Sequence, residues 1–214
     1  MGKHFRFFTS MISVPLWGVR KSKALPFFHA FSGCDTTSAF FGKGKKTAWQ
    51  AWQAYSDATE AMAHLADHPF THLDEDSDCF SVLERLVVIL YDKTSHLSCV
   101  DEARKVLFCH MNRAMDKLPP TKNCLLHHVR RAIYQAGIWT KSTQAQFDLP
   151  SAQDFAWRQS EDSWKPLWMT VPEVSKACSQ LVKCACKDAC SVCKCAKASP
   201  KCSLLGKCAC TRGK

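Results

Sequence analysis

Apolar side chains recur at helical spacing through the middle of this chain. Within residues 79–91 they fall three or four positions apart and therefore share one face of a helix: Phe80, Leu83, Val87 and Leu90. The stretch that follows Ser98 repeats this spacing to about Met115, and residues 46–66 and 122–136 are further helix candidates. We therefore predict four helices between about residues 46 and 137. No convincing alternation of apolar and polar residues, the pattern typical of strands, occurs among them.

Capping residues and glycines indicate where these helices begin and end. The acids of Asp76–Asp78 precede the second predicted helix, and carboxylates are favoured at helix N-termini. Gly137 is placed to end the fourth, because glycine commonly follows a helix C-terminus. Upstream, residues 21–31 predict a short helix or turn-helix, and residues 1–20 form an aromatic, strand-like and otherwise irregular start. Antiparallel packing of the helices is the expected architecture of the body.

The helical pattern is lost over residues 138–170. This stretch has prolines, few aliphatic residues and four tryptophans: Trp139, Trp157, Trp164 and Trp168. It predicts an irregular strap that docks its tryptophans against the helical body, with an exposed aromatic binding surface as the alternative. Residues 171–182 predict a further short helix.

Positive charge is concentrated at the C-terminal end. The 214-residue chain has a formal net charge of +10. From residue 176 onward there are nine Lys and Arg residues against one acid, Asp188, so a net +8 (nine minus one) lies in this segment. A basic segment of this kind favours nucleic acid or another anionic surface as its partner.

Cysteines gather in the same segment. Of the 14 in the chain, nine lie close together: Cys178, Cys184, Cys186, Cys190, Cys193, Cys195, Cys202, Cys208 and Cys210. The N-terminus lacks a continuous apolar core of signal-peptide length, and no run approaches the roughly 18 apolar residues of a membrane span. We therefore expect an intracellular, reducing compartment and no membrane partner. Dense cysteines in such a compartment act as thiolates and metal ligands before they form disulfides.

The spacing of these cysteines predicts zinc binding. Thiolates one to three residues apart can reach a common ion, and Zn²⁺ accepts four sulfurs tetrahedrally. A segment with no apolar core would then take its folding free energy from the metal. A disulfide knot and a metallothionein-like metal buffer are the alternatives. Lysines between the cysteines would face nucleic-acid phosphate: Lys183, Lys187, Lys194, Lys197, Lys201 and Lys207.

The cysteine-rich segment resembles the tesmin-type CXC repeat, a zinc module of DNA-binding proteins. The resemblance covers about 30 residues and rests on the three Cys-X-Cys pairs in "CACKDACSVCKCAKASPKCSLLGKCAC". Gly206 stands where that pattern would supply another cysteine, and a closing cysteine after Cys210 is absent. The resemblance implies zinc binding and contact with DNA.

A second resemblance lies in "SGCDTTSAFFGKGKKTAW", which is similar to the end of a flap-endonuclease-type 5′-nuclease domain. In that superfamily a Gly-Cys-Asp or Gly-Ser-Asp element supplies one acidic ligand of a two-magnesium site, which activates water for phosphodiester attack. A helix-hairpin-helix then grips the DNA backbone. The resemblance implies that Asp35 is the metal-binding acid and that the hairpin comprises five residues: Gly42, Lys43, Gly44, Lys45 and Lys46.

The remaining acids of such a nuclease are missing. About thirty residues precede Asp35 and contain no Asp or Glu, and one carboxylate cannot hold two Mg²⁺ ions. Asp35 is then a helix N-cap or turn residue after Gly33, in a truncated or degenerate nuclease relative. Activity would require a protein partner that contributes the missing N-terminal nuclease portion.

The wider order of segments also resembles the C-terminal portion of uncharacterised, mobile-element-associated proteins of animal genomes. The expected fold is mainly α: a helical body with a helix-hairpin-helix-like element (residues 21–137), a Trp-rich strap (138–170) and a small zinc-stabilised tail (171–214). The expected function is zinc-dependent binding of DNA or RNA in the nucleus, without independent catalysis. A metal-dependent structure-specific nuclease and a metal-buffering or protein-interaction module are the alternatives.

Overall fold

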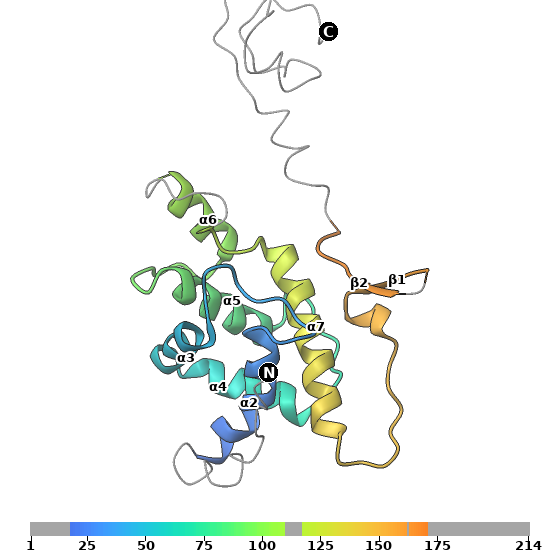
Figure 1. Ribbon diagram of the computed structural model, residues 1–214. Coiled ribbons are helices and arrows are strands. Elements are labelled where there is room, and N and C mark those ends of the chain that lie inside the picture. Colours follow the sequence, from blue (N-terminus) through green and yellow to red (C-terminus); the bar gives the residue numbers. More distant parts are fainter. Residues whose placement is uncertain (1–17, 110–116, 162, 171–214) are drawn as a thin grey trace, which may run out of the picture. The chain divides into compact units, whose positions relative to one another are not determined.

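A computed structural model describes residues 18–109, 117–161 and 163–170 (Figure 1). The chain divides into two compact units, Met1–Trp168 and Met169–Lys214. Nearly all described residues belong to the first unit, which is the subject below. The predicted irregular start (residues 1–20), the short helix at 171–182 and the cysteine-rich tail lie wholly or mostly outside the described residues.

The described part of the chain is mainly helical, as the apolar spacing predicts. Its α-helices are α2 (Val19–Phe31), α3 (Lys45–Ala54), α4 (Asp57–Asp67), α5 (Asp78–Tyr91), α6 (Val100–Cys109) and α7 (Lys122–Lys141). The predicted cap of α5 falls within Asp76–Asp78, where the Ser77 side chain accepts from the Phe80 backbone N–H. None of the described helices is long and apolar enough to cross a membrane.

The predicted helix of residues 46–66 is in fact two helices, α3 and α4. The chain leaves helical geometry at Tyr55, where φ is −134° and ψ is 87°. The indole of Trp52 is fully buried and donates a hydrogen bond of 2.9 Å to the Thr59 hydroxyl, across the break. The bend lets both short helices bury their apolar faces, which one straight helix of that length could not do.

The predicted end of α7 at Gly137 is also wrong, since the helix continues to Lys141. Gly137 serves a different purpose: a Cβ atom there would lie 2.6 Å from the Phe70 ring. Phe70 has a positive φ of 64° and turns its ring onto α7, where it meets Tyr134 at a centroid distance of 6.0 Å. The glycine therefore provides room for an aromatic side chain within the helix rather than a helix end.

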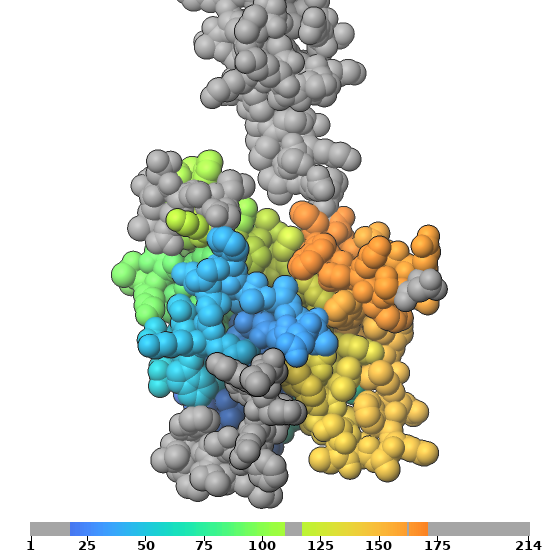
Figure 2. Space-filling model, viewed as in Figure 1, coloured from blue at the N-terminus to red at the C-terminus, as the bar shows by residue number. Residues whose placement is uncertain are grey.

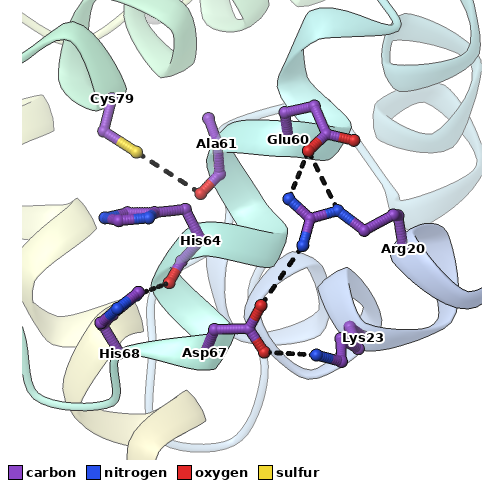
Figure 3. A network of polar contacts seen from close by, with 8 residues as sticks. All are labelled: Arg20, Lys23, Glu60, Ala61, His64, Asp67, His68 and Cys79. Carbon is purple, nitrogen blue, oxygen red and sulfur yellow. Dashed lines mark hydrogen bonds and ion pairs between the residues drawn. The ribbon is translucent and has the colours of Figure 1, made fainter.

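The core forms where α2, α3, α4, α5 and α7 meet. Its fully buried large side chains include Phe27, Trp52, Met62, Phe80 and Leu125. On the solvent side, α2 and α4 are joined by ion pairs (Figure 3). Arg20 contacts Glu60 and Asp67, and Lys23 donates to Asp67 over 2.6 Å. Because these charged groups are largely exposed, the network adds little stability and mainly sets the register of the two helices.

The strap contains regular structure that the sequence analysis did not predict. It holds a short 3-10 helix, η2 (Ala152–Phe155), and an antiparallel hairpin of β1 (Trp157–Ser160) and β2 (Ser163–Pro166). Figure 1 shows the chain returning from the end of α7 to the hairpin. The buried Arg131 guanidinium fastens it to α7 by donating to the Leu167 carbonyl over 2.7 Å. Trp139 and Trp157 pack against the core as predicted, whereas Trp164 and Trp168 are exposed.

Candidate nucleic-acid interface at the start of α3

The connection between α2 and α3, residues 32–44, lies on the surface between α7 and α5. Figure 2 shows it in blue on the face turned toward the viewer. At one end, the Thr36 hydroxyl donates to the Gln135 side-chain oxygen of α7 over 2.6 Å. At the other, the buried Phe40 ring packs edge-on against Tyr91 of α5, with 6.5 Å between centroids. The connection that leads into the predicted hairpin (residues 42–46) is therefore held against both helices.

The Gly-Cys-Asp element forms a tight turn at the end of α2. Gly33 has a φ of 102°, and a Cβ there would lie 2.6 Å from the Cβ of Ala39. The Cys34 N–H donates to the Thr37 carbonyl over 3.1 Å, and the buried Thr37 hydroxyl donates to the Ala30 carbonyl over 2.6 Å. The need for glycine here is thus steric and conformational.

Asp35 lies exposed on this turn and caps no described helix. Among the described residues there is no group of three or more His, Cys, Asp or Glu side chains that could hold a metal ion. The part of the chain that the structure describes therefore does not fit the two-magnesium site of the nuclease resemblance, and no hydrolytic step is derived for it.

Cys34, beside Asp35, has a perturbed thiol. Burial acts to raise the pKa of Cys34, but hydrogen bonds from the hydroxyl and backbone groups of Thr36 and Thr37 outweigh it and lower the pKa. The sulfur lies 3.0 Å from the Thr37 hydroxyl oxygen and 3.3 Å from that of Thr36. These contacts add polar bonds that hold the turn closed.

Lys45 holds the end of α2. Its ammonium donates to the carbonyls of His29 and Gly33 over 3.0 and 2.6 Å, and to the Ser32 hydroxyl over 3.1 Å. Burial lowers the pKa of Lys45, while the nearby Cys34 opposes the shift. A cation at a helix C-terminus stabilises the exposed carbonyls and the helix dipole. A direct contact of Lys45 with nucleic acid would compete with these three bonds.

The other predicted hairpin residues leave the start of α3 accessible. Lys46 is exposed, and the half-buried Lys43 places its ammonium 5.0 Å from the centre of the Tyr91 ring. Gly42 and Gly44 are open, since a Cβ on either would meet no heavy atom within 4 Å. Gly44 is the N-cap residue that precedes α3, and it makes no side-chain cap hydrogen bond. The result is an exposed helix N-terminus beside lysines.

His128 of α7 supports this region and was not selected from the sequence. One ring nitrogen lies 2.8 Å from the Phe31 carbonyl oxygen, and the other 3.2 Å from the Ser38 hydroxyl oxygen. Burial lowers the pKa of His128 to about 4, so the ring is neutral near pH 7. Its spacing from Leu125 and Ala132 on one face of α7 was the signal that would have indicated burial.

The nine cysteines predicted to bind zinc, and the six lysines among them, lie outside the described residues. The five other cysteines are free thiols: Cys34, Cys79, Cys99, Cys109 and Cys124. Comparison of the chain with protein-family models, curated proteins and solved structures gave no match.

Proposed function

We propose that this chain binds nucleic acid, mainly through phosphate, and holds zinc in its cysteine-rich tail. The observation that carries the proposal is the exposed, basic start of α3, formed by Gly42, Gly44 and Lys46 and oriented by Lys45. Contacts to the sugar-phosphate backbone position a protein without reading bases. Binding through this surface is therefore salt-sensitive and weakly sequence-specific.

The chemistry of this surface suits a phosphate oxygen. The first backbone N–H groups of a helix have no partner within the helix, and the helix dipole attracts anions to that end. α3 has no acid in its first turn to compete for these groups. Open space beside the backbone of Gly42 and Gly44 allows a phosphate to approach it closely. Lys46, and Lys43 with a rearranged side chain, would add positive charge.

The tail would add a zinc-stabilised basic surface to the same function. Its nine thiolates are the ligands that zinc prefers, and zinc binding would order lysines for contact with phosphate. The expected compartment is reducing, and the nucleus is the reducing compartment that contains DNA. Catalysis is not part of the proposal, because a magnesium site needs further carboxylates beside Asp35, and the described residues do not gather such a group.

The first test compares two variants that remove the same charge. Lys43→Gln/Lys46→Gln alters the proposed surface, and Lys105→Gln/Lys117→Gln alters exposed lysines on other segments. With labelled duplex DNA we expect the first variant to bind several-fold more weakly. The slope of its plot of log affinity against log salt should become less negative by about 1.8, since each lost phosphate contact reduces the slope by about 0.9. Equal weakening by both variants would overturn the proposed surface.

The zinc part has a separate test, native mass spectrometry of the reduced full chain. Nine thiolates at four per metal hold about two zinc ions, and bridging sulfurs allow about three. We expect this count, and weaker DNA binding after chelation. A chain with no zinc would refute the zinc part. Magnesium-dependent DNA cleavage that Asp35→Asn abolishes would instead establish the nuclease alternative.

A further inference from the structure

The hairpin of β1 and β2 places two cations directly opposite each other. Arg158 pairs with Lys165 in the register of the two strands, next to the pair of Gln159 and Trp164. Both cationic side chains are exposed, and within the described structure neither makes an ion pair or a side-chain hydrogen bond. Like charges directly opposite each other destabilise a strand pair. The register therefore places two positive charges side by side on the exposed hairpin.

The hairpin also exposes a large aromatic ring on a firm support. Trp164 is 47% exposed, although Trp157 on the other strand of the hairpin packs against the core. The base of the hairpin is closed by the Leu167 N–H, which donates to the Ala156 carbonyl over 2.8 Å. Arg131 of α7 then holds Leu167 in turn. The exposed Trp164 ring is thus carried on a hairpin that is fastened to α7.

We propose that this hairpin binds single-stranded nucleic acid. Trp164 stacks on an unpaired base, and Arg158 and Lys165 contact the phosphates that flank it. The paired cations match the charge of a phosphate backbone, which removes their repulsion when it binds. An exposed ring beside two cations matches the faces of bases, which are accessible in a single strand and stacked within a duplex.

The strand geometry gives the path of the nucleic acid. Successive residues of a strand point to opposite faces, so Trp164 lies on one face of β2 and Lys165 on the other. In the described sheet β2 pairs only with β1, which leaves its outer edge open. The single strand crosses this edge, with its base on the Trp164 face and its backbone reaching the face of Arg158 and Lys165.

This inference rests on the proposed function for nucleic-acid binding but concerns a different surface, and it names the strandedness of the ligand. The test measures affinity of the zinc-loaded full chain for a labelled single-stranded oligothymidylate and for a duplex of equal length. Trp164→Ala should weaken single-strand binding about tenfold and duplex binding less than twofold, because stacking on an exposed ring needs an unpaired base. Phe108→Ala, which removes another exposed aromatic ring, is the matched control and should change neither.

The cation pair has its own signature. Arg158→Gln/Lys165→Gln should flatten the salt dependence of single-strand binding by about 1.4, at about 0.7 for each lost phosphate contact. Lys165→Glu replaces the repulsion with an opposite-charge pair, so it should raise the thermal midpoint while it weakens binding. Lys105→Gln/Lys117→Gln supplies the control for removal of charge.

The outcomes separate this inference from the proposed function. If the hairpin variants bind as tightly as the wild type while Lys43→Gln/Lys46→Gln binds more weakly, only the inference about the hairpin is overturned. Equal loss of single-strand and duplex affinity in Trp164→Ala overturns the stacking role. A chain that binds neither oligonucleotide at low salt overturns both proposals. If the hairpin variants weaken binding to an acidic peptide or to anionic vesicles but not to the single strand, the inference about the hairpin is overturned.

Discussion

Gly33 determines how the chain leaves α2. Its φ of 102° lies beyond the range that L-residues tolerate, and its Cα faces the backbone of Ala39. The turn that follows directs Thr37 back to α2 and leaves Asp35 in solvent. The glycine of the Gly-Cys-Asp element thus has a purely structural explanation, which holds whatever Asp35 does.

Substitution of Gly33 by alanine should therefore destabilise the body strongly. We expect a loss of about 3 kcal/mol in the free energy of unfolding, from backbone strain and the contact with Ala39 together. Gly42→Ala is the control: φ is 67° there but space is open, so the loss should be about 1 kcal/mol. Urea unfolding followed by circular dichroism measures both. Similar losses in the two variants would contradict the packing around Gly33.

His128 makes the stability of the body sensitive to acid. Burial lowers its folded pKa from 6.5 to about 4, so the unfolded chain binds a proton first as the pH falls. The stabilisation is complete above about pH 6.5 and is lost at about 1.4 kcal/mol per pH unit down to about pH 4. Burial also lowers the pKa values of His29 and His127, which add to the slope in the same direction.

The contribution of His128 is measured as a difference between the wild type and His128→Gln in the slope of the free energy of unfolding against pH. Unfolding free energies at several pH values should fall less steeply for the variant, since its side chain does not titrate. At neutral pH the variant should be less stable, because the bonds to Phe31 and Ser38 are altered. Parallel pH profiles would show that His128 is not buried in its neutral form.

At the scale of elements, α7 connects the body to the strap through a close aromatic contact. Gly137 admits the Phe70 ring, which also meets Phe155 of η2 at 6.2 Å between centroids. Tyr134 packs against Phe155 at 5.2 Å. A glycine within a helix lowers its stability by about 1 kcal/mol, a cost that this packing offsets.

A double-mutant cycle tests that contact. Gly137→Ala alone should destabilise the protein by roughly 1 kcal/mol, since overpacking against the ring exceeds the gain in helix propensity. In a Phe70→Ala background the same change should stabilise by about 1 kcal/mol through propensity alone. Urea unfolding of the four proteins measures the coupling. A stabilising effect in both backgrounds would contradict the close approach.

The elements that the sequence predicted well are those with strong apolar periodicity. α5 begins and ends within a residue of its predicted bounds because its apolar face and its cap agree. Gly137 misled the prediction of α7, because glycine ends a helix and admits a close neighbour equally well. The hairpin of the strap was missed, since two four-residue strands are too short to show an alternating pattern.

At the scale of the whole molecule, the candidate site could be predicted only in part. The sequence indicated a Gly- and Lys-rich segment, but not that Lys45 would be bonded to the end of α2 while Lys46 stays in solvent. That division depends on how α2 and α3 approach each other, a tertiary arrangement that local spacing does not specify. The hairpin with Arg158 and Lys165 was missed for the same reason, because its register is known only from the fold.

The most direct test of the central claim, that this chain binds nucleic acid through phosphate, is the affinity of the reduced, zinc-loaded full chain for a labelled oligonucleotide over a salt series. Measured from about 50 to 200 mM, log affinity should fall linearly with log salt, with a slope that corresponds to several phosphate contacts. Binding that does not respond to salt, or no binding at the lowest concentration, would contradict the claim.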